Sequence, residues 1–243
     1  RDPVHGGIHA GRSGMVPLAA LPGRGEDACP TGELMRTLDW YFDFISPFAY
    51  FGLHELPSLP PDVRIDYKPV LFAALLDHWG QKGPAEIPPK RTWTYRSCIW
   101  WASQRGIDFR VPAAHPFNPL PYLRLSIAAG NRPDAVMAIY RAIWTTGVDA
   151  SDPMVWQGLA ADLGIDPARL GDATVKNELR RNTETAAARG VFGVPTLMVG
   201  EVPFWGADAM DFARACLADP GLLERGEMAR AANLPQGVTR VPR

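Results

Sequence analysis

The chain has 243 residues, of which 47% are hydrophobic and 21% charged, and its formal net charge is -1. This composition is typical of a globular protein with one large domain or two small ones. The near-zero charge argues against nucleic-acid binding, and no apolar run reaches the roughly 20 residues of a membrane span, so we expect a small-molecule partner.

The first 34 residues differ in composition from the remainder. They are rich in Gly, Pro and small residues and contain no apolar core of a signal peptide. We expect residues 1–34 to be disordered upstream sequence, natural or artificial in origin, and the fold to begin near Met35.

The next elements predict a β-α-β unit. Residues 38–44 alternate and are rich in aromatic side chains, which is typical of a strand. Pro47 suits the first turn of a helix, which we expect to end near Leu56 because Pro57 follows. Residues 63–69 alternate again and predict a second strand, parallel to the first through a right-handed crossover.

About 90 residues in the middle of the chain have helical periodicity. The clearest helix is 133–147, which places a row of apolar residues on one face. A Ser151-Asp152 cap followed by Pro153 predicts another helix that ends near residue 163. Further helices are predicted over 92–106, 120–130 and 175–189.

Strands return near the end of the chain. Residues 196–199 form a short apolar run, and a turn at Gly200-Glu201 leads into a partner strand at 202–204, where Pro203 predicts an edge position. A final amphipathic helix is expected over 208–217. The sequence therefore predicts an α/β sheet domain formed by 36–80 and 184–220, with an all-helical insertion over 81–183.

Two motifs carry the chemistry. Ser46-Pro47-Phe48-Ala49 stands where the first strand meets the first helix, and its hydroxyl could be a simple N-cap or could face a ligand. Gly193-Val194-Pro195-Thr196 precedes the third strand, and we predict a cis peptide bond at Pro195. A cis bond there would present the N–H and C=O of Val194 to an extended peptide.

This order of elements resembles the DsbA-like branch of the thioredoxin superfamily, whose redox members carry a CxxC motif at the start of the first helix. Over residues 36–217 the closer resemblance is to 2-hydroxychromene-2-carboxylate isomerases and kappa-class glutathione transferases. It is carried by DFISPFAY (43–50), KPVL (68–71), IPPKR (87–91), FNPL (117–120), AIW (142–144), RGVFGVPT (189–196) and FWGAD (204–208). Because Ser46-Pro47-Phe48-Ala49 replaces CxxC and disulfide exchange needs a thiolate, we do not expect ordinary oxidoreductase activity.

The resemblance implies a DsbA-like α/β fold, thioredoxin-like with an all-helical insertion domain, and a glutathione-dependent isomerase. The Ser46 hydroxyl would stabilise the thiolate of bound glutathione, helped by the helix N-terminus. That thiolate would add reversibly to a conjugated aromatic substrate, so that a ring opens and a bond rotates before the thiolate leaves. Glutathione would be returned unchanged and would act as a cofactor.

The resemblance also implies further contacts with glutathione. The Val194-Pro195 pair would bind the cysteinyl backbone, Lys90 the glycine carboxylate and Asp208 the γ-glutamyl ammonium. Lys90 could instead be a solvated charge, and Asp208 could also cap the last helix. Gln81 stands where the family usually has asparagine, and Ala209 replaces Arg or Ser, which leaves a backbone N–H for the γ-glutamyl carboxylate.

Two other functions stay open. A kappa-like transferase would share the thiolate site but consume glutathione, whereas a non-catalytic peptide-binding protein would use the Val194-Pro195 edge. Members of the resembled family form dimers, so we expect this chain to form a homodimer.

Of several aromatic residues that could line a substrate pocket, we expect one or two to do so. The candidates are Phe44, Phe48, Trp93, Trp100, Phe204 and Trp205. His115 could donate a proton to a substrate oxygen, but we interpret it as a structural loop histidine, because nothing in the sequence places a partner beside it.

Cysteines and histidines support neither a disulfide framework nor a metal site. The three cysteines, Cys29, Cys98 and Cys216, have no CxxC spacing, and five histidines include no HxxxH pair. We therefore expect a reducing compartment, the cytoplasm, and inert buried thiols at Cys98 and Cys216.

Overall fold

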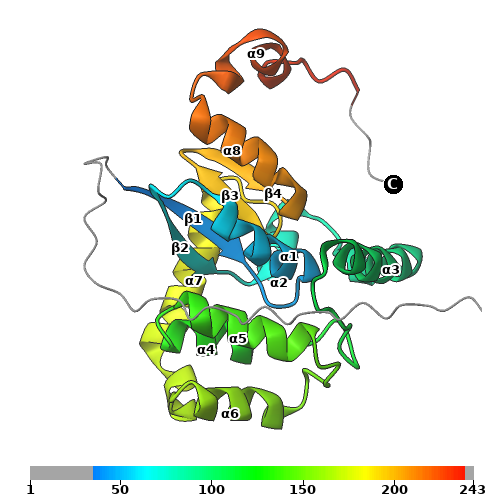
Figure 1. Cartoon of the computed structure of the whole chain (residues 1–243), viewed down its shortest axis with the longest axis vertical. Coiled ribbons are helices and arrows are strands. Elements are labelled where there is room, and N and C mark those ends of the chain that lie inside the picture. The colour runs from blue at the N-terminus through cyan, green and yellow to red at the C-terminus, as the bar shows by residue number, and fades with distance from the viewer. Residues whose placement is uncertain (1–34, 239–243) are drawn as a thin grey trace, which may run out of the picture. The chain divides into compact units, whose positions relative to one another are not determined.

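The structure is a computed structural model that describes residues 35–238 (Figure 1). The expectation for residues 1–34, and Cys29 with it, lies outside the described residues. The helices and strands, in chain order, are β1 (Arg36–Phe42), α1 (Pro47–Glu55), β2 (Val63–Pro69), α2 (Phe72–Trp79), α3 (Pro88–Arg105), α4 (Leu120–Ala128), α5 (Pro133–Trp144), α6 (Pro153–Asp162), α7 (Ala173–Ala188), β3 (Thr196–Val199), β4 (Val202–Trp205), α8 (Met210–Ala218) and α9 (Gly226–Ala232).

A mixed four-stranded sheet forms the centre of the fold, with strand order β2-β1-β3-β4. β1 runs parallel to β2, whereas β3 is antiparallel to both β1 and β4. The predicted parallel pair is therefore confirmed. β4 is an edge strand, as Pro203 predicts, and an edge tolerates a residue that cannot donate a ladder hydrogen bond.

Side chains of β1 alternate between the two faces of the sheet and so build two cores. Trp40 and Phe42 belong to a large core that also contains side chains of α1, α5 and α8. Tyr41 points to the opposite face and joins a smaller core with Leu75 of α2 and Ala186 of α7. Helices thus cover both faces of the sheet, which is the predicted thioredoxin-like arrangement.

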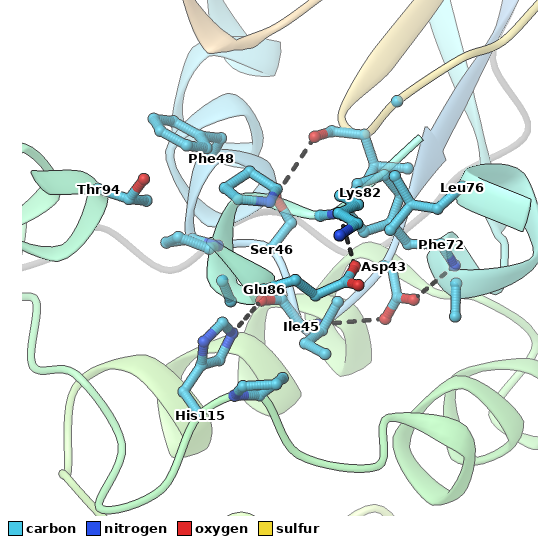
Figure 2. A pocket seen from close by; sticks show the side chains of 18 of the residues that line it. Asp43, Ile45, Ser46, Phe48, Phe72, Leu76, Lys82, Glu86, Thr94 and His115 are labelled. Atoms are coloured by element: carbon cyan, nitrogen blue, oxygen red, sulfur yellow. Dashed lines mark hydrogen bonds between the residues drawn. The ribbon is translucent and has the colours of Figure 1, made fainter. Parts of the chain in front are cut away.

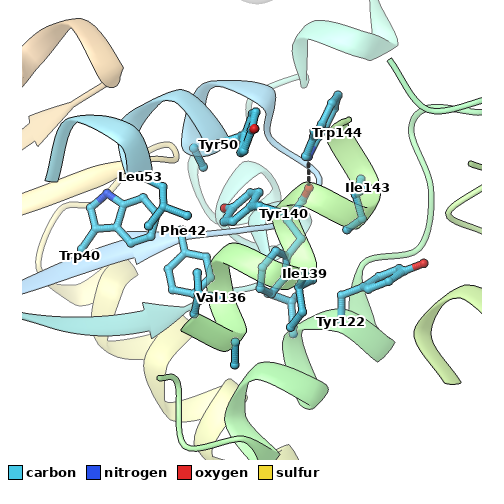
Figure 3. Packing of buried hydrophobic residues seen from close by; sticks show 14 of the residues in the cluster. Trp40, Phe42, Tyr50, Leu53, Tyr122, Val136, Ile139, Tyr140, Ile143 and Trp144 are labelled. Atoms are coloured by element: carbon cyan, nitrogen blue, oxygen red, sulfur yellow. Dashed lines mark hydrogen bonds between the residues drawn. The ribbon is translucent and has the colours of Figure 1, made fainter. Parts of the chain in front are cut away.

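The large core continues without a break into the helical part of the chain. Phe42 packs against Phe44 and Tyr140, and the same cluster reaches Tyr122 of α4 and Leu159 of α6 (Figure 3). α4, α5 and α6 contact one another and lie together in Figure 1. The division into a sheet domain and an insertion domain at residues 80–81 and 183–184 stays a prediction.

Two side chains of α5 hold the segment that follows β1. The Trp144 indole Nε1 donates a hydrogen bond to the backbone carbonyl of Phe44 at 2.9 Å (Figure 3), and the Tyr140 hydroxyl donates to that of Asp43 at 3.1 Å. Both α5 side chains are fully buried. The two carbonyls have left the sheet ladder, so these bonds satisfy groups that would otherwise be costly to bury.

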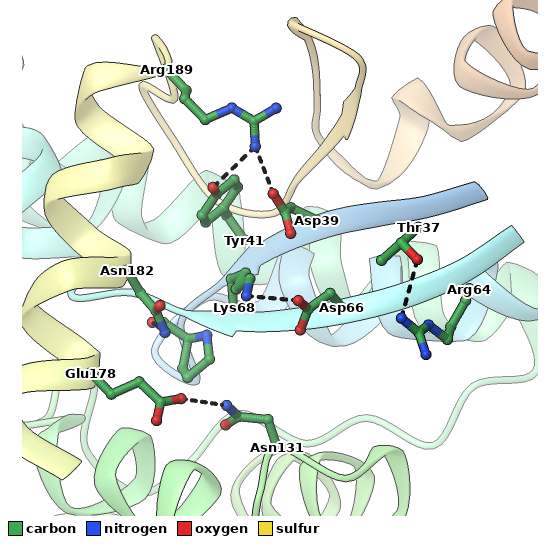
Figure 4. Close-up of polar contacts among 11 residues, drawn as sticks. Thr37, Asp39, Tyr41, Arg64, Asp66, Lys68, Asn131, Glu178, Asn182 and Arg189 are labelled. Carbon is green, nitrogen blue, oxygen red and sulfur yellow. Dashed lines mark hydrogen bonds and ion pairs between the residues drawn. The ribbon is translucent and has the colours of Figure 1, made fainter. Parts of the chain in front are cut away.

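Arg189, just after α7, ties that helix to the sheet (Figure 4). Its guanidinium donates to the Asp39 carboxylate at 2.6 Å and to the Tyr41 hydroxyl at 3.4 Å, and it also reaches the carbonyl of Gly200 at 2.7 Å. The chain that enters β3 is therefore fixed at its start by a residue of the matched RGVFGVPT stretch.

Some predicted bounds were wrong. The first strand ends at Phe42 rather than residue 44, because the chain turns there and Ser46 N–H donates to the carbonyl of Asp43. α3 begins at Pro88 rather than 92, since prolines are tolerated in a first helical turn. The last predicted helix begins at Met210, after a short 3₁₀ turn at Ala207–Ala209, so Asp208 is not its N-cap.

Two helices were not predicted. α2 lies in an apolar run whose eight residues are too few for a clear period. α9 has no buried residue, so it has no apolar face to read. Within residues 35–238, no helix is long and apolar enough to cross a bilayer.

We expect Tyr140→Phe to lower the free energy of unfolding by about 0.5–1.5 kcal/mol, because the buried carbonyl of Asp43 loses one of its two donors and keeps only Ser46 N–H. Urea unfolding followed by fluorescence would measure this loss. The matched control is Tyr67→Phe, which removes a part-buried hydroxyl that has no hydrogen-bond partner among residues 35–238. Equal losses in the two variants would contradict the assigned role of the Tyr140 hydroxyl.

Candidate active site

The N-terminus of α1 presents a buried serine. Ser46 has extended backbone angles (φ -93°, ψ 115°) and caps the helix, since its Oγ accepts a hydrogen bond from Ala49 N at 3.3 Å. Pro47 occupies the first helical position, where its missing N–H costs nothing. The capping role predicted for Ser46 is confirmed, and its side chain is only 7% exposed.

The Ser46 hydroxyl faces a segment that is distant in sequence. Its Oγ donates to the backbone carbonyl of Val194 at 3.3 Å. The Val194–Pro195 peptide bond is cis, which confirms the prediction, and a second cis bond, His115–Pro116, was not predicted. In the described part of the chain, no group accepts a hydrogen bond from Val194 N–H.

A cavity of about 490 Å³ opens beside these two segments (Figure 2). Four of the predicted site residues line it: Ser46, Gln81, Lys90 and Val194. Its walls are mostly apolar. They include Phe48, Phe72, Leu76, Phe117 and Trp205.

The other predicted site residues do not line this cavity. Pro195 is buried, and Asp208 and Ala209 lie in the 3₁₀ turn that precedes α8. Trp205, three residues before Asp208, does reach the cavity. The contacts of Pro195, Asp208 and Ala209 with the γ-glutamyl and cysteinyl parts of glutathione therefore stay predictions.

Cations and one carboxylate line the side of the cavity formed by α3 and the segment before it. Lys82, Lys90, Arg91 and Glu86 all contribute to the lining and all are exposed. Arg91 is engaged with neighbouring side chains, but Lys90 forms no ion pair or hydrogen bond through its side chain with any described residue. Lys90 is thus available to an anionic ligand.

Of the six aromatic candidates, Phe48 and Trp205 line the cavity, as many as expected. Trp205 packs edge to face with Phe192, which also lines it. The remaining candidates do not line it, because Phe44 and Phe204 are core residues and Trp93 and Trp100 point to solvent with 66% and 61% exposure.

His115 lies in the cavity wall inside a hydrogen-bonded network. Its Nε2 is 2.8 Å from the carbonyl of Ile45, so this nitrogen must carry a proton, and its Nδ1 is 2.7 Å from the Tyr95 hydroxyl, which donates to it. Arg91 donates to both Tyr95 Oη and the His115 carbonyl. Burial lowers the pKa of His115, which keeps the ring neutral. This supports the structural role expected for His115.

Asp43 is a site residue that the sequence analysis missed. Its carboxylate is fully buried and lines the cavity, and it accepts hydrogen bonds from Ile45 N at 3.1 Å and Phe72 N at 2.9 Å (Figure 2). Burial raises the pKa of Asp43 to about 7, against the lowering effect of these backbone donors. The sequence feature that could have identified Asp43 as a buried acid is its position as the one charged residue in the aromatic stretch YFDFI.

The described cysteines are buried and lie outside the cavity lining. Burial raises the pKa of Cys98 to about 12 and that of Cys216 above its ordinary value. Both thiols are therefore poor nucleophiles. Among the described residues, no cluster of His, Cys, Asp and Glu could hold a metal ion.

Comparisons with known proteins agree with this architecture. The family model described as a DSBA-like thioredoxin domain matches residues 37–218. The chain is 31% identical over 195 residues to a 2-hydroxychromene-2-carboxylate isomerase of Sphingobium xenophagum, covering 76% of this chain and all of the relative. It is 26% identical over 209 residues to glutathione S-transferase kappa 2 of Caenorhabditis elegans, covering 76% of this chain and 93% of the relative.

Solved structures show the same fold. One of 2-hydroxychromene-2-carboxylate isomerase superposes with a TM-score of 0.65 at 23% identity, covering 75% of this chain and 94% of that chain. A probable DsbA oxidoreductase of Streptomyces coelicolor gives a TM-score of 0.55 at 18% identity, covering 84% and 93%. At these identities the likeness concerns the fold.

We expect Asp43 to make stability fall as pH rises. The carboxyl titrates at its ordinary 3.8 when unfolded and at about 7 when folded, so between these values the folded state holds one more proton. Its contribution to the unfolding free energy then falls by about 1.4 kcal/mol per pH unit. Urea unfolding at about pH 5 and 6 should show a slope that Asp43→Asn removes.

Asp162→Asn is the matched control, since this exposed residue at the end of α6 should leave the slope of the wild type intact. An identical slope in the Asp43→Asn variant would contradict the buried, protonated state of Asp43.

Proposed function

We propose that this chain, which belongs to the DsbA-like thioredoxin domain family, is a glutathione-dependent isomerase acting on a conjugated aromatic compound similar to 2-hydroxychromene-2-carboxylate. Two relatives named 2-hydroxychromene-2-carboxylate isomerase are 31% and 26% identical to this chain. The observation that carries the proposal is the Ser46 hydroxyl, held at a helix N-terminus on the cavity wall beside the backbone of Val194.

The residues that line the cavity suit glutathione. The unused N–H of Val194 is the donor that an extended peptide backbone needs. Lys90, which has no partner in the described chain, would hold the glycine carboxylate, and Gln81 offers an amide that can both donate and accept. A volume of about 490 Å³ falls in the range of small-molecule sites.

Ser46 would stabilise a bound sulfur through a small rotation of its hydroxyl. Its proton is directed at the Val194 carbonyl over 3.3 Å, which is long for a hydroxyl donor. Turning this proton toward a thiolate would exchange a weak neutral bond for a charge-assisted one. It would also release the Val194 carbonyl, so that both backbone groups of Val194 could serve a ligand.

The helix N-terminus adds to this effect. α1 points its positive end at the same place, and the dipole and the hydroxyl both favour an anion over a neutral thiol. Glutathione, when bound, supplies the thiolate that adds reversibly to the substrate. Ser46 itself is not the nucleophile, because within residues 35–238 no base takes its proton: the only hydrogen bonds of Oγ there are to backbone groups of Val194 and Ala49.

The apolar walls suit an aromatic substrate. Phe48, Phe72 and Trp205 offer ring faces and edges that can pack on an aromatic ring next to the sulfur. Disulfide exchange is not supported, since no cysteine lines this cavity among the described residues. We place the protein in the cytoplasm, where the glutathione pool is reduced, and the homodimer stays a prediction.

A kappa-like glutathione transferase is the second candidate, because the chain is also 26% identical to such a transferase. The two reactions share the thiolate site and differ in their products. A transferase consumes glutathione and releases a stable thioether, whereas an isomerase returns glutathione unchanged. Quantifying free thiol after turnover of a chromene carboxylate or of an electrophilic aromatic compound separates the two.

We expect Ser46→Ala to keep glutathione binding but to lower turnover by about 10²- to 10³-fold, the usual loss when one anion-stabilising donor is removed. The pKa of the bound thiol should rise, which the ultraviolet absorbance of the thiolate against pH would show. Thermal unfolding with and without millimolar reduced glutathione measures binding in both proteins.

Asp152→Ala is the matched control for the lost cap. Asp152 caps α6 through Met154 N, and it does not line the cavity, so its loss should cost a similar roughly 1 kcal/mol of stability without loss of turnover. No stabilisation of the wild type by up to about 10 mM glutathione would overturn the proposal and favour peptide binding at Val194.

We expect Lys90→Gln to weaken glutathione binding about two- to fivefold, because an exposed ion pair contributes little, and to leave the rate at saturation unchanged. Calorimetric titration of both proteins would measure it. Arg96→Gln, on the same helix and outside the cavity lining, should bind like the wild type. An unchanged affinity in Lys90→Gln would show that Lys90 is a solvated charge.

A further inference from the structure

A second cavity lies away from the Ser46 site, between α4, α7 and the start of α2. Its volume is about 320 Å³, and none of its lining residues is shared with the first cavity. Its charged lining consists of Arg124, Lys176, Arg180 and Glu184. Three cations against one carboxylate leave an excess of positive charge in a concave site.

The cations come from two facing helices. Lys176, Arg180 and Glu184 recur every four residues along α7, so they share one face of that helix. Arg124 comes from α4, and it is the only charged residue in the sequence LPYLRLSIA of that helix. Six of the other eight residues of α4 are buried, so α4 is a core helix that carries one guanidinium at this cavity.

Arg124 is the unusual residue of the group. Its Nε is buried, and it has no hydrogen-bond partner within residues 35–238. No ion pair or hydrogen bond through any other atom of this guanidinium is formed with a described residue either. A guanidinium has five N–H donors, and partial burial without an acceptor is unfavourable.

The neighbouring carboxylate does not satisfy this charge. Glu184 lies 3.9 Å from Arg180 Nε, a long contact between two well-exposed side chains. Thr183 also lines the cavity, but its hydroxyl already donates to the carbonyl of Leu179 and accepts from Leu71 N. Apart from the Glu184 carboxylate, the polar side chains left to a ligand at this cavity are therefore cationic donors.

We propose that this second cavity binds the phosphate group of a small phosphate-bearing molecule, held by Arg124, Lys176 and Arg180. A phosphate carries a charge of about -1.5 to -2 near neutral pH and three strong acceptor oxygens. Arginine forks match its geometry, and lysine adds a point charge. About 320 Å³ exceeds what the phosphate alone would fill, so the remainder of the molecule lies over Leu71, Ala74 and Leu120.

The test is calorimetric titration of the full chain with inorganic phosphate, at constant ionic strength set with chloride. We expect saturable binding by the wild type, and an affinity at least about tenfold lower in Arg124→Gln, as removal of a charged hydrogen-bond donor predicts. Arg181→Gln is the matched control, because this exposed arginine neighbours Arg180 but does not line the cavity. Its affinity should equal that of the wild type.

Two further titrations test where phosphate binds and whether the site prefers phosphate to a carboxylate ligand. Lys90→Gln should bind phosphate like the wild type, because Lys90 belongs to the first cavity. Succinate at the same ionic strength should bind more weakly than phosphate. The proposed site would be overturned if the wild type did not bind phosphate, if Arg124→Gln bound it as tightly as the wild type, or if Lys90→Gln lost phosphate binding. The assignment to phosphate would be overturned if succinate bound more tightly than phosphate.

Discussion

The geometry of the first cavity depends on how the chain is held where it leaves β1. Over residues 43–46 it stops pairing in the sheet, turns, and reaches Ser46, the N-cap of α1. Four hydrogen bonds fix this turn: Tyr140 and Trp144 donate to the carbonyls of Asp43 and Phe44, and the Asp43 carboxylate accepts from two backbone N–H groups. All of these groups are buried or partly buried, so breaking any of them leaves an unsatisfied polar group.

This turn links the two sides of the cavity. Asp43 connects the end of β1 to the first residue of α2, while His115 connects the carbonyl of Ile45 to Tyr95 of α3. The helices that carry the apolar and cationic walls are therefore positioned against the same few residues that position Ser46. Because these contacts already hold Ser46 in place, its hydroxyl does not have to be ordered when a ligand binds, and that entropy cost is avoided.

The N-terminus of α1 is a place where a helix dipole can act on sulfur. A thiol at a helix N-terminus gains from the dipole, because the dipole lowers its pKa. The same field acts on any sulfur brought to the same place. Here the protein provides a hydroxyl and an open cavity, and its described cysteines, Cys98 and Cys216, are buried elsewhere.

Charge is distributed unevenly over the two cavities. In the first, cations lie at exposed positions beside apolar walls, which suits an acidic ligand with an apolar part. In the second, a core helix contributes a single arginine with no protein partner among residues 35–238. A net charge of -1 for the whole chain conceals both features, since it averages over surfaces that differ in local charge.

The sequence by itself determined the strands β2 and β3, the start of α1 at Pro47, the cap at Ser46 and the cis bond at Val194–Pro195. These features depend on neighbours within a few residues, through alternation, proline geometry and helix capping, and so they can be read locally. The family resemblance added the fold, because motifs in a fixed order over residues 37–218 specify a topology.

The tertiary structure alone decided which of these residues meet. Ser46 and Val194 are 148 residues apart in the chain, and they come together because β3 pairs with β1. Asp43 is buried where the chain leaves β1, beside the start of α2 and Tyr140 of α5, and its raised pKa comes from this burial, which its sequence neighbours do not reveal. Lys90 and Gln81 reach the cavity. Asp208 and Ala209 do not line it, because Gly206, with φ of 101°, and the 3₁₀ turn that follows it redirect the chain after β4. Contacts between distant segments depend on packing, and local patterns do not encode packing.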